Sequence, residues 1–211
     1  MTDTTAPRPS APPAASTFVL FHGWQNHRPD GHWQHWLATE LTRRGHVVRY
    51  PQLPDADEPT PEAWEAAVRA ELSALPEGPV TVLCHSLSCL VWLRLQAGDA
   101  PPRADRVALV APPSPEVIAG QPIHAFVAGD LFAGRRLAPG GDREAVLVAG
   151  DDDEWLPLGA VDTWEARVAA PVHVVPRGGH LTPDSGYGAW PAVLAWALGA
   201  PAADAFAERG R

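Results

Sequence analysis

Short apolar runs alternate along the chain with longer segments whose apolar residues recur at helical spacing. The first run is Thr17–Phe21, TFVLF, and residues 32–44 after it place Trp33, Trp36 and Leu37 on one helical face. A short continuous apolar run is typical of a buried strand, and a repeat at three and four positions is typical of an amphipathic helix. These two segments are therefore predicted to be a strand followed by a helix.

The same alternation continues to the end of the chain. Later strands are expected at 46–50, 79–83, 106–110, 145–149 and 172–176, and later helices at 61–75, 87–97, 160–168 and 187–198. Strands that alternate with helices usually form a parallel sheet with helices on both faces. The predicted fold class is α/β, with a mostly parallel sheet of about six strands covered on both sides.

The length of 211 residues is enough for one sizeable core, so residues 17–200 are expected to form a single domain. Residues 1–16 lack the apolar stretch of a secretion signal and are predicted to be a disordered tail. Residues 201–211 are predicted to be a C-terminal tail. Residues 111–144, rich in proline and glycine, leave two interpretations open, a substrate-facing lid or a surface excursion.

The charge balance limits the classes of partner. All 16 cationic residues are arginines, and 25 acidic residues give a net charge of -9. This excess of acid argues against nucleic acid and anionic membrane surfaces, and no run reaches membrane-spanning length. Cys84 and Cys89 are predicted to be buried thiols in a reducing compartment, which places the protein in the cytoplasm. No pattern indicates an oligomeric state.

A serine stands where a strand pattern changes abruptly into a helix pattern. Ser86 lies between the expected strand 79–83 and the expected helix 87–97. Ligands of a doubly wound sheet gather at the carboxyl ends of its strands, so the hydroxyl of Ser86 is expected at a site. A serine in such a sharp turn is the nucleophile of many hydrolases.

A serine hydroxyl needs a base and a group that orients the base. His180 follows the expected strand 172–176, and Asp153 follows the expected strand 145–149. The order serine, acid, histidine is the one that nucleophile-elbow hydrolases use. Ser86, His180 and Asp153 are therefore the candidate catalytic residues, although Asp151 or Asp152 could take the role of the acid if the loop is shifted.

Two backbone amides are candidates for an oxyanion hole. The amide of Leu87 follows the nucleophile, and the amide of Trp24 lies in the loop after the first strand, where Gly23 allows close approach. His22, Gly23, His85 and Trp155 lie in the same loops, and we expect them to line the substrate pocket.

Five motifs in this order are similar to those of a known family. They are HGW at 22–24, HWQHWL at 32–37, HSL at 85–87, DDEWLP at 152–157 and GGH at 178–180. The chain resembles the small serine hydrolases related to retinoblastoma-binding protein nine and bacterial YdeN, over nearly all of its length. The resemblance implies a compact α/β-hydrolase with esterase-like activity and a triad of Ser86, Asp153 and His180.

The turn departs from the usual GxSxG pattern. It reads CHSLS, so Cys84 and Ser88 stand where glycines normally relieve crowding. Both are small residues, and the sharp turn is still expected to form.

A metal site was also considered at the histidines near the start of the chain. His32 and His35 lie three apart on one helical face, with His27 and Asp30 nearby. There is no HExxH motif and no cysteine that would complete a tetrahedral set, so no metal is predicted. The expected chemistry also needs no cofactor.

The sequence therefore predicts a serine hydrolase that cleaves a carboxylic ester of small or medium acyl chain through an acyl-enzyme on Ser86. Its partner would be a small-molecule ester. One alternative keeps the triad and changes the reaction to thioester or amide cleavage, or to acyl transfer. Another is a non-catalytic binding protein on a hydrolase scaffold.

Overall fold

Six strands form one parallel sheet in the computed structural model, which describes residues 16–128, 136–140 and 144–206. The strand order is β2-β1-β3-β4-β5-β6, and every neighbouring pair of strands is parallel. The strands are β1 Thr17–Phe21, β2 Val47–Arg49, β3 Val80–His85, β4 Arg106–Val110, β5 Glu144–Gly150 and β6 Val172–Val175. The predicted α/β class and the single sheet of six strands are confirmed.

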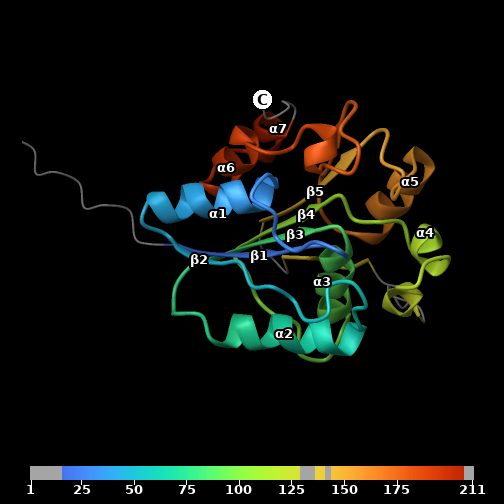
Figure 1. Cartoon of the computed structure of the whole chain (residues 1–211), viewed down its shortest axis with the longest axis horizontal. Helices are drawn as coiled ribbons and strands as arrows, with labels where there is room; N and C mark the ends of the chain where they lie inside the picture. The colour runs from blue at the N-terminus through green and yellow to red at the C-terminus, as the bar shows by residue number, and fades with distance from the viewer. Residues whose placement is uncertain (1–15, 129–135, 141–143, 207–211) are drawn as a thin grey trace, which may run out of the picture.

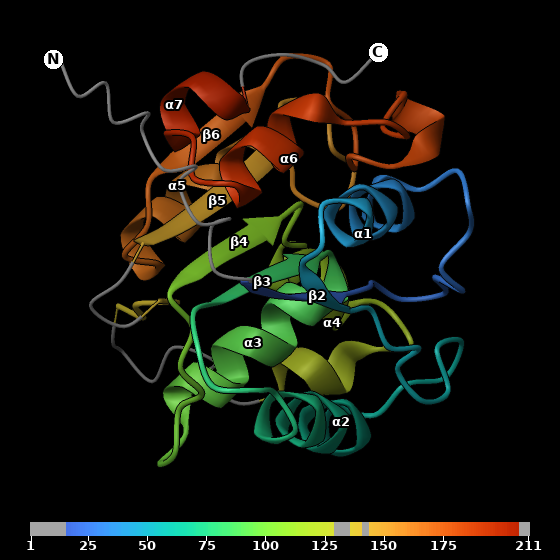
Figure 2. The same cartoon turned by 90° about the vertical axis from the view of Figure 1, so that its left-hand side faces the viewer.

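Helices cover both faces of this sheet (Figure 1). The longer helices are α1 Trp33–Arg43, α2 Pro61–Ser73, α3 Leu87–Ala97 and α5 Leu158–Arg167. The shorter ones are α4 Pro115–Ala119, α6 Pro191–Ala197 and α7 Ala202–Ala205, with 3₁₀ turns η1 His124–Val127 and η2 Pro183–Ser185. Figure 2 shows α1 and α6 on one side of the sheet and α2 and α3 on the other.

The side chains of the strands alternate between two hydrophobic cores. In β1, Phe18 and Leu20 belong to the core under α1, α6 and α7, whereas Val19 and Phe21 belong to the core under α2, α3 and α5. Both sets are buried, which is why the strand reads as a continuous apolar run rather than an alternating one.

The order of the strands creates the place for a site. The chain runs from β1 outward to β2 and then returns to the other side of β1 to form β3. The helices that follow β1 and β3, α1 and α3, therefore pack on opposite faces, and the carboxyl ends of these two strands border a crevice.

The C-terminal region differs from the sequence-based expectation. The helix expected at 187–198 begins only at Pro191, because residue Trp190 before the proline has extended backbone, with φ −131° and ψ 82°. Residues up to 206 are not a tail: α7 packs on the domain, and the fully buried Phe206 contacts Trp190 and Trp196 with ring centroids 5.7 and 5.9 Å away. The gain from burying this aromatic ring orders the segment.

The described part of the irregular segment 111–144 packs against the core of the protein. Ile118, Ile123 and Phe126 are buried in the core on the α3 side. The Ser114 amide donates to the carbonyl of Trp155 at 2.7 Å, which fastens the segment to the loop after β5. The rest of the region expected as lid or excursion includes 129–135 and 141–143, which lie outside the described residues, as does nearly all of the expected tail 1–16.

Both cysteines are buried and form no disulfide. Burial raises the pKa of each thiol above its ordinary value. Among the described residues, no helix has the length and apolar character needed to cross a membrane.

The end of β5 touches the turn that follows β6. A Cβ on Gly150 would lie 2.7 Å from the backbone nitrogen of Gly179 and 2.9 Å from the carbonyl carbon of Gly178. Real Cβ atoms do not approach backbone this closely, so only glycine fits at the end of this strand.

Gly150→Ala is therefore expected to lower the free energy of unfolding by about 1–3 kcal/mol, the usual cost of overpacking. Gly159→Ala is the matched control, because a Cβ at that helical position meets nothing within 4 Å. The control is expected to leave stability unchanged or to raise it by up to about 1 kcal/mol. Urea unfolding of both variants measures the difference, and equal stability of the two would contradict the close contact.

Candidate active site

The turn that carries Ser86 is strained in the way a nucleophile elbow requires. Ser86 lies between β3 and α3, with φ 54° and ψ −123°, a backbone conformation that residues other than glycine rarely adopt. Its amide donates to the carbonyl of Val110 at 2.9 Å, so the neighbouring strand β4 holds the turn in place. The sequence-based expectation of a sharp turn at this point agrees with this geometry.

The elbow closes without the usual glycines because Ser88 makes hydrogen bonds there. The Ser88 hydroxyl accepts from the amide of His85 at 3.0 Å and lies 2.8 Å from the carbonyl of Phe21, to which it donates. Cys84 is fully buried on the other side of the turn. The hydroxyl of Ser88 thus ties the elbow to the end of β1, a role that the sequence alone did not reveal.

Three consecutive aspartates organise the loop that carries His180. Asp151 accepts the amide of Arg177 at 2.6 Å, and Asp152 accepts the amide of Gly179 at 2.6 Å. Of the three carboxylates, that of Asp153 lies within hydrogen-bonding distance of the His180 imidazole. The other two carboxylates shape the backbone of the turn instead.

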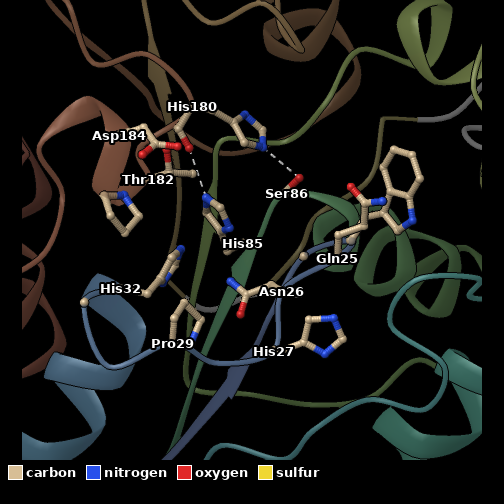
Figure 3. Close-up of a pocket in the computed structure, with 14 residues that line it drawn as sticks. Gln25, Asn26, His27, Pro29, His32, His85, Ser86, His180, Thr182 and Asp184 are labelled. Atoms are coloured by element: carbon tan, nitrogen blue, oxygen red, sulfur yellow. Dashed lines mark hydrogen bonds between the residues drawn. The ribbon is translucent and has the colours of Figure 1, made fainter.

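Ser86, His180 and Asp153 form a continuous hydrogen-bonded row (Figure 3 shows the first two). The Ser86 Oγ lies 2.8 Å from His180 Nε2, and His180 Nδ1 lies 2.9 and 3.0 Å from the two oxygens of Asp153. A carboxylate can only accept, so His180 Nδ1 carries the proton and its Nε2 is free to accept from the serine hydroxyl. The side chain of Asp153 is 0% exposed and that of His180 17% exposed.

The orientation of Asp153 is set by its own loop. One of its oxygens accepts the amide of Trp155 at 2.9 Å. Hydrogen bonds from that amide and from the imidazole hold the side chain, which is 0% exposed. The acid is therefore held in position before any substrate arrives.

The loop after β1 is fixed from its buried side. His22 is fully buried, donates through Nδ1–H to the carbonyl of Gly23 at 2.8 Å, and accepts at Nε2 from the amide of Leu53 at 2.8 Å. The side-chain amide of Gln52 also donates to His22 Nε2, at 2.9 Å. The two cavities next to Ser86, described below, are not lined by His22. The structure therefore places His22 behind the loop and not in the expected substrate pocket.

Gly23 brings this loop against the elbow. A Cβ at Gly23 would lie 2.8 Å from the Cβ of Ser86, so a larger residue would push the two loops apart. The buried Gln34 adds a second tie, because its side-chain amide donates to the carbonyl of Phe21 at 2.9 Å. Gln34 therefore supports the site. This role could not be inferred from the sequence, because its hydrogen-bond partner is a backbone atom, which no residue type indicates.

The two residues whose amides are expected to form the oxyanion hole, Trp24 and Leu87, line one cavity together with Ser86. Leu87 is the first residue of α3, where a backbone N–H has no acceptor within the helix. Trp24 follows the close contact at Gly23, and its indole donates to the carbonyl of Asp57 at 2.9 Å, which holds the residue in place. Both residues border the same cavity next to the serine hydroxyl.

Two cavities meet at Ser86. The smaller, about 190 Å³, is lined by Trp24, Leu87, Ile118, Ile123 and Trp155 and by the polar residues Gln25, Ser86 and His180. The larger, about 560 Å³, extends past His32 and His85 toward the loop after His180 (Figure 3). Of the expected pocket residues, Gly23 and His85 therefore line the larger cavity and Trp155 the smaller.

His85 and His32 lie next to His180 in the lining of the larger cavity. The Nε2–H of His85 donates to the carbonyl of His180 at 3.0 Å, and His32 Nδ1 accepts the amide of Gln34 at 3.2 Å as the cap of α1. The rings of His32 and His85 stand 5.0 Å apart between centroids. Among the described residues, no group of three or more His, Cys, Asp or Glu side chains is arranged to hold a metal ion.

The strand order and the turn at Ser86 are those of the α/β-hydrolase fold, which the solved structures described below share. The chain belongs to the serine hydrolase family, whose model matches residues 18–197. This agrees with the family resemblance found in the sequence. The comparison with curated proteins gives no significant match.

Solved structures with the same fold include two YdeN-type proteins. A YdeN-like hydrolase from Pectobacterium atrosepticum is 23% identical, with 85% of this chain and 87% of the other covered and a TM-score of 0.67. The ydeN gene product of B. subtilis is 21% identical, with 87% and 97% covered and a TM-score of 0.69. The esterase domain of a Rhodothermus marinus protein is 17% identical, with 89% and 88% covered and a TM-score of 0.60. At these identities the likeness concerns the fold.

Burial keeps three histidines of this region uncharged at neutral pH. Desolvation lowers the pKa of His22 and of His32 to about 4, and it lowers the pKa of His85 well below the ordinary value. Unfolding returns these rings to an ordinary pKa of about 6.5. Between pH 6.5 and pH 4 the unfolded chain therefore binds more protons than the folded one, and stability falls as the pH is lowered through that window.

The free energy of unfolding is expected to fall by about 2 kcal/mol per ring between pH 7 and pH 5. His22→Asn removes one of these rings. The difference in the free energy of unfolding between pH 7 and pH 5 should therefore become smaller by about 2 kcal/mol, whatever the substitution does to stability at pH 7. His35→Asn is the control, since that side chain is 40% exposed on α1. Urea unfolding at both pH values measures the difference, and an unchanged dependence in His22→Asn would contradict the burial argument.

Proposed function

We propose that the protein hydrolyses carboxylic esters of short acyl chain through an acyl-enzyme on Ser86. The observation that supports this best is the hydrogen-bonded row of Ser86, His180 and Asp153, whose members come from three different loops at one edge of the sheet. Holding Ser86 in its strained backbone conformation costs about 1–3 kcal/mol of stability. A purely structural role for the row would not explain this cost, whereas a catalytic role would. The serine hydrolase family of the chain supports the same reaction type.

In the proposed first half-reaction, Ser86 Oγ attacks the ester carbonyl carbon as His180 Nε2 takes its proton. The amides of Trp24 and Leu87 donate to the oxygen on which negative charge develops. Asp153 keeps the imidazole in the required tautomer and stabilises its positive charge. The tetrahedral intermediate collapses, and the His180 proton passes to the leaving alcohol.

In the second half-reaction, a water molecule takes the place of the alcohol. His180 Nε2 accepts a proton from the water as its oxygen attacks the acyl carbon, and the same proton then returns to Ser86 Oγ. The acid leaves and the enzyme is restored. Every proton in this sequence is carried by side chains already within hydrogen-bonding distance, so the cycle is complete without a cofactor.

The size of the acyl group is inferred from the smaller cavity. Its volume of about 190 Å³ lies below the roughly 300 Å³ at which pockets for drug-sized ligands begin. Its walls include Leu87, Ile118, Ile123 and Trp155, which suit a short hydrocarbon chain. An acetyl to butanoyl group is therefore the proposed occupant.

A fluorophosphonate is expected to modify wild-type protein at Ser86 alone, as mapped by mass spectrometry. Ser86→Ala should give no adduct and should lower the turnover of p-nitrophenyl acetate about a millionfold, the loss seen when a serine nucleophile is removed. A folded wild-type protein that forms no adduct would favour the non-catalytic alternative instead.

Asp153→Asn is expected to lower kcat about 10⁴-fold, because an amide at this position favours the wrong tautomer of His180. Asp162→Asn, a change at an exposed position of α5, is the control and should keep wild-type activity. Steady-state kinetics on a p-nitrophenyl ester compares them, and a loss below tenfold in Asp153→Asn would speak against its role as the orienting acid.

A further inference from the structure

The two cavities that meet at Ser86 differ in size and in most of their lining residues, although His180 lines both. The smaller measures about 190 Å³ and the larger about 560 Å³, and only the larger falls within the range of pockets that hold drug-sized ligands. An ester placed on Ser86 sends its acyl group and its alcohol in different directions. The difference between the cavities therefore bears on which half of the substrate is large.

The larger cavity lies on the side of the leaving alcohol. In the proposed reaction His180 must hand its proton to the oxygen of that alcohol, so the alcohol extends past the imidazole. Thr182, Pro183 and Asp184, which follow His180 in the chain, line the larger cavity and do not line the smaller. Leu87, whose amide binds the carbonyl oxygen in the proposed reaction, lines only the smaller one.

The inner wall of the larger cavity offers flat, uncharged surfaces. The rings of His32 and His85 lie there, each 2% exposed. Pro29 and Pro183 add two further rings to the lining at exposed positions. Burial lowers the pKa of both imidazoles, so neither carries charge at neutral pH. Asp184, the acidic residue of the lining, lies at an exposed position, as does His27.

We infer that the substrate carries its larger part on the alcohol side: a short-chain acyl ester of a bulky, uncharged, ring-bearing alcohol. This inference rests on the proposed function, since it assumes that Ser86 attacks and that His180 protonates the leaving group. The acyl half is limited by the smaller cavity, and the ring of the alcohol packs between the imidazole and proline rings of the larger one.

Two isomeric esters test this directly. Phenethyl acetate has its ring on the alcohol and a short acyl group, whereas ethyl phenylacetate has the same atoms with the ring on the acyl side. Both release a primary alcohol, and the alkaline hydrolysis rate of each corrects for intrinsic reactivity. After this correction, the wild-type kcat/KM for phenethyl acetate is expected to be at least about tenfold higher than that for ethyl phenylacetate. A hydrophobic pocket can discriminate by about this factor between substrates that differ in the placement of one apolar group.

A variant that fills the larger cavity should abolish this preference. Gly31 lines that cavity, and a Cβ there meets nothing within 4 Å, so Gly31→Phe adds a ring without disturbing the fold. The ratio of kcat/KM for the two esters is expected to fall about tenfold or more. Gly159→Phe is the matched control, equally open to a Cβ but outside both cavities, and should keep the wild-type ratio.

Equal rates for the two esters in wild-type protein, a preference for ethyl phenylacetate, or an unchanged ratio in Gly31→Phe would overturn the inference. Fluorophosphonate labelling of the same samples separates this result from a failure of the proposed function. Labelling at Ser86 with the wrong ratio overturns only the assignment of the cavities. Absence of labelling overturns the proposed reaction itself.

Discussion

The geometry of the site depends on the contact between the end of β5 and the turn that follows β6. Gly150 lies against the backbone of Gly178 and Gly179, and the next two residues accept amide protons from that turn. The turn contains Arg177, Gly179 and Leu181, all with positive φ, a conformation that costs energy at the two that are not glycine. The carboxylates of Asp151 and Asp152 stabilise this conformation, and the position of His180 follows from it.

The part of the site at the ends of β1 and β3 is held in the same way, by hydrogen bonds from polar side chains to the backbone. Ser88 and Gln34 both donate to the carbonyl of Phe21, and His22 fixes the loop that follows it. These groups are buried, and each finds a backbone partner, so the desolvation of their polar atoms is compensated. As a result, Ser86 and the two amides beside it are presented by a rigid frame, as a preorganised site requires.

Much of this arrangement could be predicted from the sequence, because strand ends and turns have local signals. The apolar runs marked the strands, and Ser86, Asp153 and His180 were each predicted at a strand end, where the structure has them. The role of His22 could not be predicted, because its partners Gln52 and Leu53 are about thirty positions away and no local pattern reports them. The burial of Phe206 was missed for the same reason, since a single aromatic residue near a chain end gives no periodicity.

The shape of the cavities also lay beyond the sequence. Ile118 and Ile123 come from the segment left open between lid and surface excursion, and only the fold brings them beside Trp155 and Leu87. Pocket shape depends on the meeting of several loops, whereas each loop is encoded separately. Reaction class is for this reason easier to infer from sequence than substrate size.

A crystal structure of the protein after reaction with a small alkyl phosphonate would test the proposed site directly. We expect a phosphonyl group on Ser86 Oγ, with its oxygen about 2.7–3.1 Å from the amide nitrogens of both Trp24 and Leu87. His180 should stay within hydrogen-bonding distance of Asp153. An adduct on another residue, or a phosphonyl oxygen turned away from both amides, would contradict it.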